Sequence, residues 1–381
     1  MVRGAAAALT PPIVPDPLPL TVRLARPDDT EAVLAFTRDT FDGWDYVPEV
    51  WAGWLAAPDG LVLVAEATDP ARAAALGLPD GPLAMARLAL LSPDEGWLEG
   101  MRVHRAARGL RVATTLQVAL LAWTQAQGAR VVRFATGETN EGSRRLGARA
   151  GFALVGRWRS YQPAEAEAAE TKDPAAQASD RPAEPAHRLR AAGLLLEPDA
   201  DGLRRWWARV EADPAVHLAA GLYESRAWSW QALTAGRMAA HARAGQVVAA
   251  ESGDWWALGI LAHDDEGVPL ADPRFALLAG DETLALRLIE ETRRVAGRPV
   301  HLRLPEETTL PEGLPEGRAR PIGAATLAAA GLVPNERAMV VLEMPLVDAA
   351  GRPVPIRTAG AGALTCGDIP ARRGLVPPWI G

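Results

Sequence analysis

The stretch Met101–Ala113 reads MRVHRAARGLRVA and decides how the first part of this chain folds. Apolar and polar residues alternate over 97–104, which predicts a strand. Apolar residues recur at helical spacing over 109–127, which predicts a long helix soon after that strand. A short loop between a strand and a helix presents unpaired backbone N–H groups and the positive end of the helix dipole to one point. Gly109 and Ala113 keep that point free of bulk, so the sequence predicts a phosphate-binding loop.

Strands and helices alternate on both sides of this loop. The predicted order is a strand, a helix, three strands, a helix, a strand, a helix and a final strand. This order predicts an α/β (α+β mixed) fold, in which a mixed, mostly antiparallel sheet is flanked by helices. The predicted elements cover 21–24, 31–41, 61–67, 83–91, 97–104, 109–127, 130–136, 140–150 and 152–161.

The predicted domain boundaries follow from one segment of unusual composition. Residues 162–187 are rich in Pro, Ala, Glu and Asp and contain no large apolar side chain, so they predict a linker. The pattern of strands and helices then repeats in outline, and residues 330–332 (AGL) echo residues 150–152 (AGF), which suggests a duplication. We therefore predict a flexible lead-in, a first domain, a linker, a second domain and a C-terminal tail, at 1–19, 20–162, 163–187, 188–346 and 347–381.

Composition narrows the class of function. The 381 residues are 49% hydrophobic, which allows sizeable cores, and the net charge of −7 argues against nucleic acid or an anionic membrane as a partner. The single cysteine, Cys366, excludes an internal disulfide, and the histidines include no close pair, so no metal site is predicted. No apolar run is long enough for a membrane span or a secretory signal, which predicts a cytoplasmic protein.

Two motifs in the predicted first domain resemble those of the GNAT acetyltransferase superfamily. Arg108–Ala113 (RGLRVA) is similar to the pyrophosphate loop (Gln/Arg)-x-x-Gly-x-(Gly/Ala), with Val103 five residues earlier on the preceding strand, as in the family. Asn140–Phe152 resembles the later motif Asn-x-x-(small)-x-x-Leu-x-x-x-x-Gly-Phe. Two positions depart from the family pattern. Arg111 replaces the middle glycine of the loop, and Gly147 stands where a tyrosine acid is common.

The resemblance implies an N-acetyltransferase that uses acetyl-CoA as its donor and an amine as its acceptor. It implies that backbone N–H groups beside Met101 and Val103 hold the pantetheine, and that Val103 polarises the thioester carbonyl and is therefore a candidate catalytic residue. It also implies that Asn140 contacts the donor or holds the end of its helix. The other implied donor-binding residues are Arg108, Gly109, Leu110, Arg111, Val112 and Ala113.

Transfer of an acyl group to an amine needs a base that leaves the amine neutral. Glu99 shares a strand face with Met101 and Val103 if side chains alternate regularly, so it is the candidate base. The alternative is an exposed or ion-paired glutamate with no catalytic role. The same alternation places His104 on the opposite face, where a surface histidine is expected.

Other residues have less definite roles in this interpretation. Tyr161, Ser143 or a water could protonate the leaving thiolate in place of the missing tyrosine. Arg102 and Arg105 lie close in sequence to the phosphate loop, and the alternative for both is a solvated arginine.

The loop Phe41–Pro48 falls where relatives of this superfamily commonly build the acceptor site. Asp42 and Asp45 could attract an ammonium group there, or they could be turn residues. Trp51 and Trp54, at helical spacing, are predicted to pack against the sheet.

The predicted second domain lacks the loop that the first one has. Its strand-to-helix turn reads Ala279–Glu282 (AGDE), and two carboxylates there would repel a diphosphate but would suit a helix N-terminus. We interpret this domain as a degenerate GNAT-like copy. The leading hypothesis is thus an acetyl-CoA-dependent N-acyltransferase acting on a small-molecule or protein amine. The alternatives are a catalytically inactive acyl-CoA-binding or regulatory protein and, from the two-domain layout alone, a tandem enzyme similar to mycothiol synthases.

Overall fold

The computed structural model describes residues 18–38, 40, 43–164, 184–226, 228–263, 270, 272–306, 322–358, 364–366 and 369. Most of the predicted lead-in, most of the predicted linker and part of the predicted tail lie outside these ranges, as does Asp42. Residues 18–164 are called the first half here, and residues 184–358 the second half.

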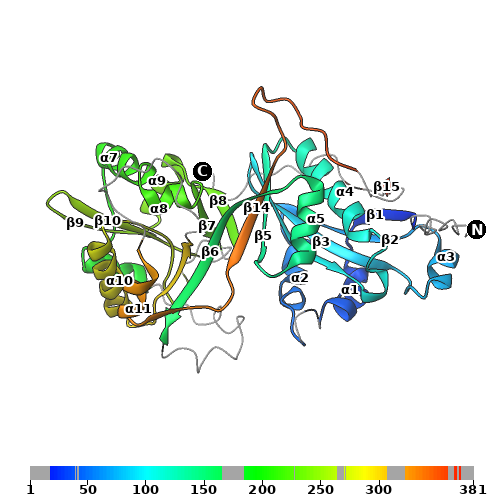
Figure 1. Ribbon diagram of the computed structural model, residues 1–381, viewed down its shortest axis with the longest axis horizontal. Coiled ribbons are helices and arrows are strands. Elements are labelled where there is room, and N and C mark those ends of the chain that lie inside the picture. The colour runs from blue at the N-terminus through cyan, green and yellow to red at the C-terminus, as the bar shows by residue number, and fades with distance from the viewer. Residues whose placement is uncertain are drawn as a thin grey trace, which may run out of the picture.

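The first half is a twisted sheet with helices on both faces (Figure 1). Its strands are β1 (Leu20–Leu24), β2 (Gly60–Ala67), β3 (Pro82–Ser92), β4 (Glu95–Val103), β5 (Val131–Gly137) and β6 (Ala153–Pro163). Its helices are η1 (Pro27–Asp29), α1 (Thr30–Thr37), α2 (Val47–Ala56), α3 (Pro70–Ala75), η2 (Arg105–Ala107), α4 (Val112–Ala126) and α5 (Glu141–Ala150).

Helix α4 covers one face of this sheet and helices α1 and α2 cover the other. The apolar side chains of α4, such as Leu116 and Leu120, are fully buried against strands β1 to β5 because they recur on one side of the helix. On the opposite face, Trp51 and Trp54 of α2 pack with Val62 and Val64 of β2, which confirms their predicted burial. The two faces therefore have separate apolar cores, and any residue of the sheet can be assigned to one of them.

The second half also combines strands with flanking helices (Figure 1). Its strands are β7 (Leu222–Arg226), β8 (Ser229–Ala232), β9 (Val247–Ser252), β10 (Trp255–Leu261), β11 (Arg274–Gly280), β12 (His301–Pro305), β13 (Leu332–Pro334) and β14 (Met339–Pro345). Its helices are α6 (Glu184–Ala191), α7 (Ala200–Glu211), α8 (Pro214–Leu218), α9 (Ala235–Arg243), α10 (Glu282–Ala296) and α11 (Ala324–Ala329), and the short strand β15 (Leu364–Cys366) follows it and pairs with β1.

The two halves share one sheet, whose strand order is β15-β1-β2-β3-β4-β5-β14-β6-β12-β11-β10-β9, with β13 also beside β6. Most neighbouring strands are antiparallel, and β4–β5 and β11–β12 are parallel pairs. The predicted α/β fold with a mixed, mostly antiparallel sheet and flanking helices is therefore confirmed. None of the described helices is long and apolar enough to cross a membrane.

Each half completes its sheet with a strand from the other half. Strand β14 comes from the second half, yet it lies between β5 and β6 and is antiparallel to both, with Val341 opposite Ala135 and Gly156. Strand β6 comes from the first half, and its far end lies between β12 and β13, with Tyr161 opposite Leu302 and Pro334. Figure 1 shows β14, in orange, between β5 and the long green β6. The halves are therefore joined by backbone hydrogen bonds as well as by side chains.

The hairpin of β7 and β8 packs on the same sheet face as α2, farther along the strands. Its Trp230 is fully buried, with ring centroids 5.9 Å from Trp97 of β4 and 5.5 Å from Trp158 of β6. Leu222 and Val341 belong to the same cluster. This face of the first half is thus covered by its own α1 and α2 at one end and by the second half at the other.

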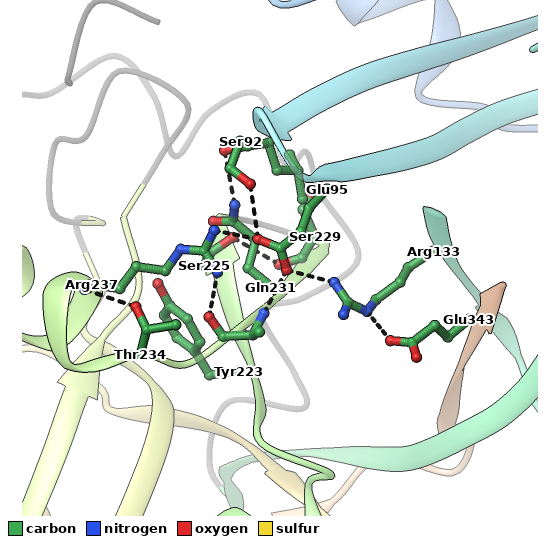
Figure 2. Close-up of polar contacts among 12 residues, drawn as sticks. Ser92, Glu95, Arg133, Tyr223, Ser225, Ser229, Gln231, Thr234, Arg237 and Glu343 are labelled. Carbon is green, nitrogen blue, oxygen red and sulfur yellow. Dashed lines mark hydrogen bonds and ion pairs between the residues drawn. The ribbon is translucent and has the colours of Figure 1, made fainter. Parts of the chain in front are cut away.

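A buried carboxylate joins the two halves beside this hairpin (Figure 2). Glu95 accepts hydrogen bonds from Arg133 Nη1 at 2.7 Å and from the Ala232 amide at 2.9 Å, and it forms an ion pair with Arg237. Arg133 Nε also donates to Glu343 Oε2 of β14 at 2.6 Å. Burial acts to raise the pKa of Glu95, but Arg237, the amide and Arg133 together hold that pKa below its ordinary value. The charge is therefore compensated where the halves meet.

Candidate functional site

Strands β4 and β5 diverge from each other in the middle of the first half. They pair in parallel only from Glu95 opposite Val131 to Trp97 opposite Arg133, although β4 continues to Val103 and β5 to Gly137. Among the described strands, none pairs with that edge of β4 over residues 98–103. An extended ligand could therefore lie beside this part of β4 in the place of a strand.

A bulge in β4 lies inside this unpaired stretch. Strand β3 opposes Glu99 with Arg87 but Arg102 with Met85, so β4 has one residue more than its partner there. Gly100 absorbs the extra residue with a φ of +65°, and a Cβ at this position would lie 2.6 Å from the Trp54 ring. Only glycine satisfies both the backbone conformation and the close contact with α2.

The bulge reverses the alternation of side chains along β4. Leu98, Met101 and Val103 pack with the α4 core, whereas Glu99 forms an ion pair with Arg87, whose guanidinium lies 5.5 Å from the Trp54 ring of α2. The prediction that Glu99 shares a face with Met101 and Val103 is therefore wrong, because regular alternation does not hold across a bulge.

His104 is placed by the same reversal. Its ring meets Phe36 of α1 edge-on, with centroids 5.9 Å apart, so it lies on the α1/α2 face that also carries Glu99. The prediction of opposite faces for these two residues is wrong for the same reason. His104 Nδ1 also accepts a hydrogen bond from the Ala106 amide at 3.2 Å and so caps the short helix η2.

Arg102 and Asp45 form a buried pair on the α1/α2 face. Arg102 Nε and Nη2 donate to the two Asp45 oxygens at 2.6 and 3.0 Å, and the Asp45 side chain has no exposed surface. Asp45 also accepts from the Val47 amide at the start of α2. Arg102 is therefore neither a phosphate neighbour nor a solvated arginine, because its guanidinium is buried against Asp45. Asp45 is a turn residue at the start of α2 and not an exposed anion. Burial raises the pKa of the adjacent Tyr46 to about 12.

The predicted phosphate loop has the expected shape. Gly109 has a φ of +82°, and α4 begins at Val112, somewhat later than predicted. Among the described residues, no acceptor lies within hydrogen-bond distance of the amides of Gly109 or residues 111–114. Arg105, Arg108 and Arg111 are exposed and have no ion-pair partner in the described part of the chain.

Arg111 has a backbone conformation that favours glycine. Its φ is +65°, in the left-handed region, which costs a residue with a side chain about 1 kcal/mol relative to glycine. The Arg111 side chain is exposed. It therefore does not cover the backbone of the loop.

The later motif forms helix α5 and explains the missing tyrosine. Asn140 is the N-cap of α5, and its Oδ1 accepts from the Ser143 amide at 3.1 Å, which is the helix-end role of the two that were predicted. A Cβ at Gly147 would lie 2.7 Å from the Phe134 ring, so no larger side chain fits there. Tyr161 packs in the apolar core of the second half, which excludes it as the substitute acid.

In the second half, carboxylates of the protein itself accept from the amides at the turn between β11 and α10. Strands β11 and β12 also pair over a short stretch only, with Arg274 opposite His301 and Phe275 opposite Leu302. At the end of β11, the Gly280 amide donates to Asp213 Oδ2 at 3.0 Å, and at the start of α10 Asp281 accepts from the Leu284 amide at 3.0 Å. The predicted capping role of Asp281 is confirmed.

Asp213 provides a pH-dependent test of this arrangement. Burial raises the pKa of Asp213 to about 6, above the 3.8 of a free aspartate. Between these two values, the Asp213 carboxyl group is protonated in the folded protein and ionised in the unfolded chain. Its contribution to the free energy of unfolding therefore falls as pH rises from about 4 to 6, by about 3 kcal/mol. Urea unfolding of wild type and Asp213→Asn across this range should show their difference in stability changing in that direction. A pH-independent difference would contradict the assignment.

The family match found by comparison with known proteins lies within the first half. Residues 30–152 match the sequence profile of the Acetyltransferase (GNAT) family. Among solved structures, a GCN5-related N-acetyltransferase from Sphaerobacter thermophilus is 15% identical, with 89% of this chain and 98% of that chain covered and a TM-score of 0.47. An N-acetyltransferase from Staphylococcus aureus Mu50 is 19% identical, with 37% and 87% covered and a TM-score of 0.30.

The ribosomal-protein-S18-alanine N-acetyltransferase from Escherichia coli is 13% identical to this chain, with 36% and 80% covered and a TM-score of 0.31. No curated protein matches the sequence. The matched residues 30–152 include the diverging strands β4 and β5 and the loop that precedes α4. The segment 30–152 therefore resembles the acetyltransferase (GNAT) family.

Proposed function

We propose that this protein is an acetyl-CoA-dependent N-acyltransferase that transfers an acetyl group to a primary amine of a small molecule or a protein. The family match supports acetyl-CoA as the donor. The observation that carries the proposal is that β4 has no described strand beside it after Trp97 and leads to a loop of amides without acceptors at the start of α4. An extended chain ending in a diphosphate matches both features.

The donor would lie along β4 with its phosphates at α4. Backbone groups beside Met101 and Val103 would bind the pantetheine in the manner of an added strand. The diphosphate would accept from the amides of Gly109 and residues 111–114, where the helix dipole favours an anion. Leu110 and Val112 would contribute main-chain groups, and the exposed side chains of Arg108 and Arg111 would add positive charge.

The bulge at Gly100 would separate the donor from the base. Glu99 is the proposed base, and it lies on the α1/α2 face, from which an amine would approach. The amine attacks the thioester carbonyl, whose oxyanion would be stabilised by the Val103 amide. The C–N bond forms and the C–S bond breaks, Glu99 takes the proton of the amine through a water, and the thiolate leaves. Gly147 has no side chain that could act as the acid, so in this mechanism a water protonates that thiolate.

Binding followed by turnover tests this proposal. Calorimetry should detect acetyl-CoA, and release of free thiol should then be measured with a panel of primary amines, including amino acids, polyamines and peptides with free N-termini. Binding together with turnover of at least one amine supports the enzyme. Binding without turnover over the whole panel supports the alternative, an acyl-CoA-binding or regulatory protein.

Replacing Glu99 with glutamine is expected to lower turnover by about 100-fold or more, because the amide cannot accept the proton. Affinity for acetyl-CoA should stay the same, since the side chain lies on the other face. Glu66→Gln is a matched control, because Glu66 is also a strand glutamate in an ion pair with an arginine, Arg23. Thiol-release kinetics compare the variants, and retention of more than half the activity in Glu99→Gln would exclude it as the base.

Donor binding is also expected to raise the pKa of His104. Burial lowers this pKa, and the cations Arg105 and Arg108 lower it further. A phosphate bound beside those arginines offsets their charge, so the pKa should rise by about half a unit or more. NMR titration of the histidine ring protons with and without coenzyme A measures this, with His104→Asn for assignment. The buried His241 of the second half, whose pKa is lowered to about 4, is the internal control and should not respond.

A further inference from the structure

A chain of ion pairs connects the second half to the proposed base. Arg226, at the end of β7, donates to Asp59 Oδ2 at 3.2 Å. Asp59, in the loop before β2, accepts through its other oxygen from Arg87 Nη2 at 2.7 Å. Arg87 in turn forms an ion pair with Glu99 through Nη1. The four side chains come from three strands and a loop, and only Arg226 belongs to the second half.

These side chains are held tightly. Their exposed fractions are 10% for Arg226, 15% for Asp59, 8% for Arg87 and 19% for Glu99. Charges this far from solvent interact more strongly than surface ion pairs, because water screens them less. Arg87 is also restricted by its stacking on Trp54. Its position is therefore set by an aromatic ring and two carboxylates.

Other charged groups near Glu99 belong to the first half. Tyr46, whose pKa responds to Glu99, lies in the segment before α2, and the Asp45–Arg102 pair lies beside it. Since Asp45 and Arg102 compensate each other, Arg87 is the main cation facing Glu99, and Asp59 competes with Glu99 for it. Arg226 reduces that competition because it neutralises part of the charge on Asp59.

We propose that Arg226 is a positioning residue for the acyl-transfer site, acting on Glu99 through Asp59 and Arg87. This inference rests on the proposed function, in which Glu99 is the base. The second half then contributes to catalysis without binding the donor: it holds the carboxylate of the first half at the position and charge that proton transfer needs. A degenerate copy of the domain is retained because the site is incomplete without its β7–β8 hairpin.

A thiol at position 99 measures the electrostatic part of this proposal without any acceptor amine. Cys366 is the only cysteine, so Glu99→Cys in a Cys366→Ser background has one thiol. Its pKa is read from the pH dependence of alkylation by iodoacetamide. Adding Arg226→Met should raise that pKa by about 0.5–1 unit, because a nearby cation is lost, and adding Asp59→Asn should lower it by a similar amount. Arg226→Lys should leave it nearly unchanged.

Arg237→Met is the matched control. Arg237 also forms an ion pair between the halves, with Glu95, but has no contact with Asp59. It should not change the pKa of the thiol at position 99. Opposite shifts for Arg226→Met and Asp59→Asn support the chain of ion pairs, since general loosening of the structure would move both variants in one direction. Shifts of the same sign, or none, overturn it.

Turnover in the otherwise wild-type full-length chain tests the catalytic part. With an amine found active, Arg226→Met should lower kcat about 10-fold and leave the KM for acetyl-CoA unchanged, and Arg226→Lys should restore most of the loss. The acidic limb of the pH profile should move to higher pH in Arg226→Met. An unchanged kcat in Arg226→Met, beside an inactive Glu99→Gln, overturns the positioning role alone. A wild-type protein that acetylates no amine contradicts the proposed function itself, and the thiol measurement then still reports on the ion pairs.

Discussion

Replacing Gly109 with glutamate is expected to abolish binding of acetyl-CoA, with a loss in affinity of about 100-fold or more. Gly109 has a φ of +82°, and no atom lies within 4 Å of a Cβ placed there, so the new side chain would be accommodated but would strain the backbone. Its carboxylate would lie beside the amides proposed to hold the diphosphate. It would repel that ligand and compete with it for the same donors. Isothermal calorimetry with acetyl-CoA measures the loss.

Gly128→Glu is the matched control for this variant. Gly128 follows the other end of α4, has a φ of +90°, and likewise has no atom within 4 Å of its Cβ position. Both substitutions strain the backbone to a similar degree, so a comparable small decrease in melting temperature is expected. Only Gly109→Glu should lose the donor. Equal affinity in the two variants would place the diphosphate elsewhere and remove the basis of the proposed site.

Separating the two halves is expected to unfold the first one. Without the second half, β5 and β6 lose the strand between them. Strand β14 also buries Val340, Val341, Leu342 and Met344, each at most 5% exposed. Four such side chains contribute about 6–12 kcal/mol together, which is comparable to the whole stability of a typical domain, about 5–15 kcal/mol. A chain ending at residue 165 should therefore lack a cooperative unfolding transition.

A protease site inserted within residues 165–183 gives the complementary experiment. After cleavage, the two fragments should elute together in size-exclusion chromatography and keep one unfolding transition, because β6 and β14 each pair with strands of the other half. A chain lacking only residues 371–381 keeps β14 and is the control for truncation. A fragment 1–165 that is monomeric and unfolds cooperatively at the temperature of the full chain would show that β14 is dispensable.

Local sequence signals predicted strands β1 to β6 and helices α1, α4 and α5, whereas α2 and α3 were absent from the predicted elements. The loop before α4, the burial of Trp51 and Trp54 and the capping by Asp281 all depend on residues within one or two turns of each other. Such features follow from side-chain period and from the chemistry of helix ends. For Asn140 the sequence left two roles open, donor contact and capping of its helix. The hydrogen bond from the Ser143 amide shows the capping role.

The errors have a different origin. The predicted face of Glu99 was wrong because of the bulge at Gly100, where the chain packs closely against Trp54 of α2. Trp54 lies 46 positions earlier in the chain. A sequence signal was present, since Gly100 interrupts an otherwise alternating strand, and glycine inside a strand often marks a bulge. The buried pair of Arg102 with Asp45 had no local signal, because its members are brought together only by packing of α2 on the sheet.

The sequence by itself determined that the chain contains a strand, a glycine loop and a helix in succession, because periodicity and turn chemistry act over a few residues. Only the tertiary structure decided which strand completes which sheet and which charges face Glu99. Strand β14 pairs with β5, and Arg226 contacts Asp59, which lies 167 positions earlier in the chain. Pairings over such separations depend on the shape of the assembled core and leave no periodic pattern in the sequence.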